Sequence, residues 1–131
     1  IDTNLSSVFY LSRIVAQRMA SARSKGVIIN MTSICAAGNA GQGAYAASKA
    51  GVTALTHSWA KELGGLGIRC VAIAPGFIDV ASTRHAVSEA HLKDIVGRVP
   101  LKKLGSVQSV FQAVRYAIEN DYVTGTVLEV D

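Results

Sequence analysis

Tyr45 and Lys49 stand four residues apart in the stretch GAYAASKAG, residues 43–51. On a helix, residues at this spacing project from one face, one turn apart. A free phenol has a pKa of about 10, and a cation beside it favours the phenolate form. The pair therefore predicts a group at Tyr45 that can donate and accept protons. A surface tyrosine beside a solvated lysine has the same spacing, so the pair needs support from its surroundings.

Hydroxyl groups are predicted near Tyr45 by the order of the elements. Thr32 and Ser33 follow the apolar run Val27–Met31, at the edge where open α/β sheets bind their ligands. The next apolar run ends in the same way, at the turn Pro75–Gly76. We expect these groups to converge on one crevice. An ordinary turn or cap hydroxyl remains the alternative for Ser33.

The elements that must position these residues alternate along the chain. Three strands are predicted at Val27–Met31, Ile68–Ala74 and Thr126–Val130. They are nearly continuous in apolar residues, as parallel strands covered on both faces are. Helices are predicted over Leu5–Met19, Ala44–Leu63 and Ser106–Glu119, with a short one near Ser88–Val96. This order predicts an α/β fold, half of a doubly wound parallel sheet, with right-handed connections.

The composition fits one folded unit. Half of the 131 residues are apolar, enough for a single modest core. The net charge of +4 comes from basic residues scattered along the chain, which disfavours a nucleic-acid partner. No apolar run reaches membrane-spanning length, and the two cysteines and three histidines lack metal-ligand spacing. We expect a cytoplasmic protein, because such cysteine usage suits a reducing compartment.

A glycine-rich segment, GNAGQG at residues 38–43, precedes the predicted Tyr45 helix. Its glycines follow the order GxxGxG, the reverse of the dinucleotide fingerprint. We interpret the segment as a flexible wall rather than a phosphate loop.

The residues of interest occur in a recognisable order: Asn4, Thr32-Ser33, Tyr45-Ala-Ala-Ser-Lys49, Pro75-Gly76 and the closing VTGTVLEVD. Together they resemble the classical short-chain dehydrogenase/reductase family, most nearly its 3-oxoacyl-carrier-protein reductase-like members. The resemblance covers the whole chain but only the carboxyl-terminal half of the family's domain. It implies that residues 1–131 form a single partial domain, with three parallel strands and flanking helices of a Rossmann-like sheet.

The resemblance implies an oxidoreductase that interconverts a secondary alcohol and a ketone by hydride transfer with NAD or NADP. A 3-oxoacyl compound is a candidate substrate. Tyr45 would be the acid/base, and Lys49 would favour its phenolate form and bind the nicotinamide ribose. Ser33 would polarise the substrate oxygen, while Asn4 would hold a water that connects Lys49 to solvent.

Further site residues follow from the same resemblance. Besides Tyr45 and Lys49, the implied cofactor contacts are Pro75, Gly76 and Ile78. The implied substrate contacts are Ser33, Cys35, Gln42 and Phe77. Cys35 also fits a small buried thiol. Residues 81–99 match the family's mobile substrate lid, with a plain surface loop as the alternative. The helices that contain Leu5 and Tyr45 usually pair with those of a second subunit, which implies a homodimer or homotetramer.

Three departures from the family pattern affect these expectations. Ser33 lies one residue closer to Tyr45 than in many members, so Thr32 remains a second candidate for the active hydroxyl. Val80 replaces a cofactor-contacting threonine, for which Ser82 or Thr83 could substitute. The arginines that bind an acyl carrier are replaced by Ser24 and Leu66.

Two other functions stay open from the sequence. A nucleotide-sugar epimerase or dehydratase of the family's extended branch also uses Tyr and Lys at this spacing, although the ending TGTVLEVD and the short lid argue against it. A non-catalytic oligomerisation fragment is the other. It predicts that the substitution Tyr45→Phe changes nothing measurable.

Overall fold

The computed structural model describes the backbone of residues 1–131 and every side chain except that of Ala86. It contains three parallel strands in the order β1-β2-β3: β1 (Gly26–Met31), β2 (Ile68–Pro75) and β3 (Thr126–Val130). The pairing aligns Gly26 with Ile68 and Val71 with Thr126. All three predicted strands are confirmed, with β1 beginning one residue earlier and β2 ending one residue later than predicted.

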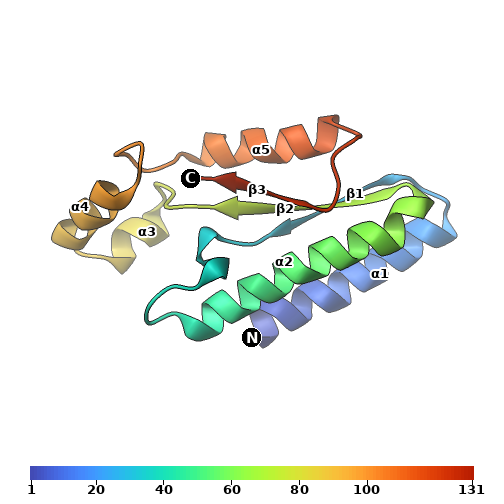
Figure 1. Cartoon of the computed structure of the whole chain (residues 1–131), viewed down its shortest axis with the longest axis horizontal. Coiled ribbons are helices and arrows are strands. Elements are labelled where there is room, and N and C mark those ends of the chain that lie inside the picture. The colour runs from blue at the N-terminus through green and yellow to red at the C-terminus, as the bar shows by residue number, and fades with distance from the viewer.

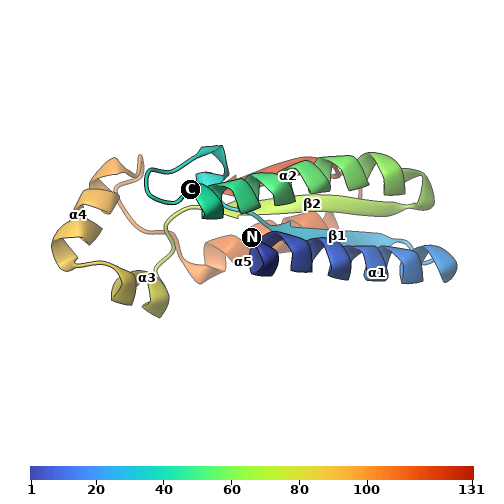
Figure 2. The same cartoon turned by 90° about the horizontal axis from the view of Figure 1, so that it is seen from below.

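Helices cover both faces of this sheet. The helices α1 (Ser7–Ser21) and α2 (Gly43–Leu63) lie on one face and α5 (Val107–Glu119) on the other (Figure 1). Seen from below, α1 and α2 run side by side (Figure 2). The predicted α/β fold is confirmed. No helix among the described residues is long and apolar enough to cross a membrane.

The two strand connections have opposite hands, which corrects the expectation of right-handed connections throughout. The strands follow one another across the sheet in chain order, yet α2 crosses on one face and α5 on the opposite one (Figure 1). Two steps in the same direction on opposite faces must differ in hand, although right-handed crossovers greatly predominate. The physical reason is coverage, because α1 and α2 already occupy the first face and only α5 buries the second.

Each face of the sheet carries its own core. Ile28, Ile68 and Cys70 pack with Ala60 of α2 and with partly buried residues of α1. On the opposite face Val71 and Ile73 pack against Ala117 of α5. The central strand β2 therefore buries both of its faces, which explains its nearly continuous apolar sequence.

A charged side chain ties α5 to the central strand. The Arg69 guanidinium, from β2, donates hydrogen bonds to the carbonyls of Ala117 (2.7 Å), Val123 (2.9 Å) and Ile118 (3.1 Å). The last carbonyls of a helix lack partners within the helix and carry partial negative charge. Arg69 thus caps the carboxyl end of α5 and fixes it over the sheet.

The helix ends follow from local sequence. Ser106 and Ser88 are the N-caps of α5 and of α4 (Glu89–Arg98), where their hydroxyls accept the backbone N–H of Ser109 (3.1 Å) and His91 (3.3 Å). The first predicted helix begins differently, because a π-helical turn, η1 (Asp2–Ser6), precedes α1. The hydrophobic spacing does not distinguish such a turn from an α-helix.

Three short elements complete the chain. They are the 3₁₀ turns η2 (Ile34–Ala37) and η3 (Gly64–Leu66) and the helix α3 (Ala81–Ala86). The sequence did not predict α3, whose residues are mostly polar.

Cys70 gives a test of this core. Burial, together with the nearby Glu62 carboxylate, raises the pKa of the Cys70 thiol to about 11. The thiolate is the reactive form, so at pH 8 Cys70 should resist a thiol reagent while the half-buried Cys35 reacts. Mass spectrometry of the labelled native protein measures both. In the control Cys35→Ser, the remaining Cys70 should be labelled only after denaturant is added. Rapid labelling of Cys70 without denaturant would contradict the described core.

Candidate functional site

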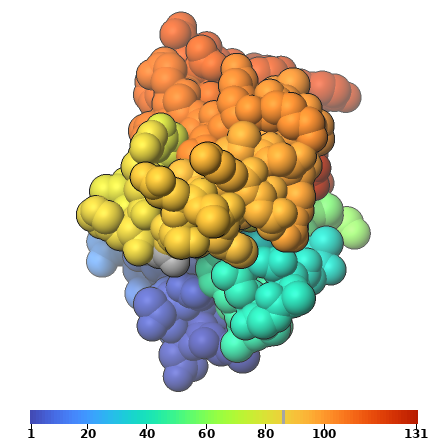
Figure 3. Space-filling view, turned by 90° about the vertical axis from the view of Figure 1, so that its left-hand side faces the viewer, coloured from blue at the N-terminus to red at the C-terminus, as the bar shows by residue number. Residues whose placement is uncertain are grey.

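The carboxyl ends of the strands lie behind α3 and α4, the helices of the predicted lid at residues 81–99. Figure 3 looks onto this end, with α3 and α4 in front and the start of the chain and of α2 below them. After β1 the chain passes through η2 and a glycine-containing loop before α2 begins at Gly43. This path returns the first turns of α2 to the end of β1.

Tyr45 and Lys49 lie together at the start of α2, as their spacing predicted. The Lys49 Nζ is 5.7 Å from the centroid of the Tyr45 ring, within the range of an attractive cation–π contact. The Tyr45 side chain remains 38% exposed. A small molecule can therefore reach the phenol while the ammonium stays beside it.

The Lys49 ammonium also contacts the strand. It donates a hydrogen bond of 2.9 Å to the carbonyl of Met31, the last residue of β1. Burial lowers the pKa of Lys49 below its ordinary value. An ammonium has three N–H donors, and this is the one hydrogen bond that Lys49 Nζ makes to the described residues. Two donors remain for a ligand.

The geometry separates the two candidate hydroxyls. The Ser33 Oγ accepts a hydrogen bond from the backbone N–H of Cys35 (3.1 Å) and is the N-cap of η2. The alternative interpretation of Ser33 as a cap hydroxyl is therefore also confirmed. Accepting that bond uses a lone pair and leaves the hydroxyl proton free. Thr32 is 4% exposed, and its Oγ1 donates to the Lys49 carbonyl (2.9 Å). Ser33 is therefore the better placed of the two to bind a substrate oxygen.

The turn after β2 is bound to its neighbours on both sides. The Gly76 N–H donates to the carbonyl of Val130 (2.9 Å), and a Cβ at Gly76 would collide with the Asp131 side chain. Glycine at this position leaves room for the Asp131 side chain, which follows β3. Ile78 pairs with Gly105 in an isolated parallel bridge. The predicted cofactor contacts Pro75, Gly76 and Ile78 consequently form a fixed turn at the carboxyl edge of the sheet.

Phe77 faces a different hollow from Ser33 and Tyr45. It lines a pocket of about 260 Å³ with Val99, Leu101, Leu104 and Val130 among its walls. Neither Ser33, Tyr45 nor Lys49 lines this pocket. The structure therefore groups Phe77 with the base of the lid.

The other predicted substrate contacts lie between β1 and α2. Cys35 is half-buried in η2. Gln42 is exposed at the start of α2, and its Oε1 accepts a hydrogen bond of 2.9 Å from the Asn39 side chain. Both residues belong to the segment that connects Ser33 to Tyr45.

Asn4 lies in the π-helical turn η1, where the Ser7 N–H donates a hydrogen bond to the Asp2 carbonyl. This turn packs against α2, since a Cβ at Gly51 would lie 2.9 Å from the Leu5 side chain. Asn4 is half-buried. Among the described residues its amide makes no hydrogen bond to Lys49. Sequence periodicity gave no signal for this turn.

The predicted lid, residues 81–99, is formed largely by α3 and α4 rather than by an irregular loop. The Arg84 guanidinium binds the Asp79 carboxylate through two hydrogen bonds of 2.5 and 2.7 Å. Hydrogen bonding to Arg84 holds the pKa of Asp79 below its usual range. The Asp79 N–H also donates to the Gly105 carbonyl (2.8 Å). Sequence reasoning did not find this ion pair, because its partners show no helical pattern.

A family model described as enoyl-(acyl carrier protein) reductase matches residues 1–131. The chain belongs to the short-chain dehydrogenase/reductase family. It is 41% identical to the (3R)-3-hydroxyacyl-CoA dehydrogenase of Canis lupus familiaris, covering 99% of this chain and 51% of the relative. It is 40% identical to the 3-oxoacyl-acyl-carrier-protein reductase FabG of Thermotoga maritima, covering 100% and 54%.

A solved structure agrees with these sequence matches. The 3-hydroxyacyl-CoA dehydrogenase type-2 of Mycobacterium avium superposes with a TM-score of 0.91 at 33% identity, over 99% of this chain and 53% of that one. The chain therefore spans about half the length of the short-chain dehydrogenases/reductases that it matches.

The environment of Lys49 predicts a pH effect. A lowered pKa means that the amine loses its proton at lower pH than a free lysine, so neutral Lys49 should appear below the ordinary value of 10.5. The rate of trace acetylation at Lys49, followed by mass spectrometry against pH, reports the neutral amine. We expect a midpoint below 10.5, and a midpoint at or above that value would contradict the described burial.

Proposed function

We propose that this chain is part of an oxidoreductase that interconverts a secondary alcohol and a ketone with a nicotinamide cofactor. The observation that carries the proposal is the Lys49 ammonium, 5.7 Å from the Tyr45 ring centroid at the carboxyl edge of the sheet. A 3-oxoacyl thioester is the first substrate to test, because the named relatives are 3-oxoacyl reductases and 3-hydroxyacyl-CoA dehydrogenases. Those names disfavour the epimerase alternative.

The donors at the end of β1 fit the nicotinamide ribose. Lys49 has two N–H groups available beyond its bond to Met31, and its half-buried ammonium suits neutral hydroxyl acceptors. The fixed turn of Pro75, Gly76 and Ile78 would lie along the nicotinamide ring. A bound nicotinamide supplies or takes up the hydride. NAD and NADP both carry this ring and ribose.

The protein's own groups would handle the proton. In the reductive direction Tyr45 donates a proton to the substrate oxygen, and Ser33 donates a hydrogen bond to the same atom. Both act on the charge that develops there. The Lys49 ammonium lies beside the Tyr45 ring that gives up this proton. Asn4 would hold the water that connects Lys49 to solvent, and the π-helical turn around it supports a special role, since such turns are frequent at functional sites.

The substrate would lie over the segment between β1 and α2. That segment contains Ser33, Cys35 and Gln42, and α3 and α4 lie above it in Figure 3. Phe77 would act from the base of the lid, where it lines the pocket with Leu101 and Leu104.

We also propose that residues 1–131 are the carboxyl-terminal half of one Rossmann-like domain. The chain spans about half of its relatives, and β1 has β2 on one side and no other strand among the described residues. A cytoplasmic location remains our expectation, supported by the two free cysteines.

Tyr45→Phe tests the catalytic proposal in the protein that carries this chain. Removing the hydroxyl leaves the ring and its packing but no transferable proton, so turnover of a 3-oxoacyl thioester should fall by about 10²- to 10⁴-fold. The measurement is the steady-state oxidation of NADH or NADPH, with circular dichroism to confirm the fold.

Tyr122→Phe is the matched control. Tyr122 is 96% exposed and lies in the turn before β3, at the opposite end of the sheet. Its variant should keep the original turnover. Equal turnover in both variants would instead favour the non-catalytic oligomerisation fragment.

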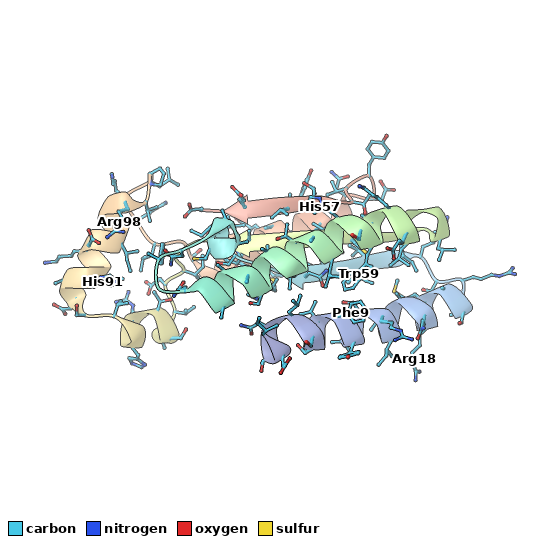
Figure 4. All side chains as sticks on the ribbon, turned by 60° about the horizontal axis from the view of Figure 1, so that its bottom comes forward. Phe9, Arg18, His57, Trp59, His91 and Arg98 are labelled. Atoms are coloured by element: carbon cyan, nitrogen blue, oxygen red, sulfur yellow. The ribbon has the colours of Figure 1, made fainter. Side chains whose placement is uncertain are left out.

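We propose that α1 and α2 pair with the same helices of a second copy, giving a homodimer or homotetramer. Phe9 of α1 and Trp59 of α2 face each other across the two helices, with ring centroids 6.1 Å apart (Figure 4). Two apolar hollows of about 410 Å³ each lie in the groove between α1 and α2. Beside it Tyr10 is 61% exposed. Large exposed apolar patches of this kind mark association surfaces.

Ala54→Arg tests this pairing. Ala54 is an exposed residue of α2 that lines one of the hollows, so a guanidinium there would meet an apolar partner and split the assembly. Sedimentation velocity should show the mass falling to that of one subunit. The control Ala90→Arg, at an exposed position of α4, should leave the assembly intact. An unchanged mass for Ala54→Arg would place the interface elsewhere.

A further inference from the structure

A row of polar contacts joins β1 to α2 beneath the candidate site. Asn30 donates from its Nδ2 to the Thr56 Oγ1 (2.9 Å). The carbonyl of the next residue, Met31, accepts a hydrogen bond from the Lys49 ammonium (2.9 Å). Thr32 then donates from its Oγ1 to the Lys49 carbonyl (2.9 Å). Three consecutive residues, the last two of β1 and the one after it, thus bind α2. Three of the side chains involved, those of Asn30, Thr32 and Thr56, are buried.

The direction of the bonds around Thr32 follows from its chemistry. A hydroxyl has one proton, and Thr32 gives its proton to the Lys49 carbonyl. The 3.0 Å contact between the Thr32 and Thr53 hydroxyls is therefore donated by Thr53. A chain of hydrogen bonds runs from Thr53 through Thr32 to the backbone of Lys49.

Lys49 is consequently held at both ends by two consecutive residues, the last of β1 and the one that follows it. Thr32 binds its carbonyl, and the Met31 carbonyl binds its ammonium. Ser33, whose hydroxyl proton is free, is the next residue along the chain. The distance between the Tyr45–Lys49 turn and Ser33 therefore depends on these contacts.

Apolar packing alone does not set that distance. Burial of apolar surface is non-directional, and the buried apolar residues of α2 are small, among them Ala46 and Val52. Hydrogen bonds, by contrast, have narrow limits of distance and angle. A hydrogen-bonded pair of hydroxyls, here one buried and one half-buried, can fix one position of a helix on a strand where methyl groups allow several.

We propose that Thr32 and Thr53 are positioning residues, whose hydroxyl pair fixes the Tyr45–Lys49 turn of α2 relative to Ser33. This inference rests on the proposed function, since the turn matters for turnover only if Tyr45 and Lys49 act there. It assigns Thr32 a role other than that of the substrate-binding hydroxyl.

Four variants of the protein that carries this chain test the inference: Thr32→Val, Thr32→Ser, Thr53→Val and Thr53→Ser. Valine keeps the shape and removes the hydroxyl, so Thr32→Val should lower kcat by about 10- to 100-fold while KM changes by less than about threefold. Serine keeps the hydroxyl and should restore kcat. Thr53→Val removes the hydrogen bond from Thr53 to Thr32 and should lower kcat by a smaller factor. Thr53→Ser should again restore kcat.

Thr56→Val is the matched control. Thr56 lies on the same helix and is fully buried, but its hydroxyl binds the Val52 carbonyl and Asn30 rather than Lys49. This variant should lower Tm while kcat stays near that of the original protein. A loss of kcat in Thr32→Val no larger than in Thr56→Val would overturn the inference.

The outcomes separate this inference from the proposed function. Loss of activity in Tyr45→Phe with unchanged kcat in Thr32→Val and Thr53→Val would reject only the positioning role. If Thr32→Val fails to fold, Thr53→Val decides, and an unchanged kcat there would reject the role. If Tyr45→Phe keeps full turnover, the proposed function itself fails. In that case amide hydrogen exchange at residues 45–49 still reports the contact, and it should be faster in Thr32→Val than in Thr56→Val.

Discussion

The Lys49 ammonium has neighbours from two parts of the fold, the Tyr45 ring of its own helix and the Met31 carbonyl of β1. Its burial lowers its pKa, so the surroundings make the charge costly while the Met31 carbonyl and the Tyr45 ring partly compensate. The candidate site exists only where helix and strand meet in this register. Farther along the same helix, Ala60 packs against the sheet core and holds α2 on this face.

The central strand provides the platform for that contact. Because β2 is buried on both faces, it needs cover from helices on each side, and α5 supplies the second cover by crossing on the face opposite α2. Arg69 then fastens α5 through three carbonyls near its end. The less common hand of one connection follows from this need for burial, and the shared β2 links the two cores on either side of the site.

The carboxyl edge of the sheet is rigid at its turns and open above them. Gly76, in the turn after β2, leaves room for the Asp131 side chain, and Gly105 binds both Phe77 and Asp79 at the base of the lid. Between these anchors α3 and α4 make few contacts with the strands and the other helices. Fixed turns next to two helices with few contacts suit a site that must admit and then enclose a small molecule.

The sequence by itself determined the strands, the main helices and the pairing of Tyr45 with Lys49, because apolar periodicity and the i, i+4 spacing are local properties. It favoured Ser33 by resemblance to the family and kept Thr32 as a second candidate, since both hydroxyls follow the same strand. Only the tertiary structure distinguished them, by placing Thr32 against the Lys49 carbonyl. The π-helical turn at Asn4 and the hand of the second connection were likewise decided by packing between distant segments, which no local pattern records.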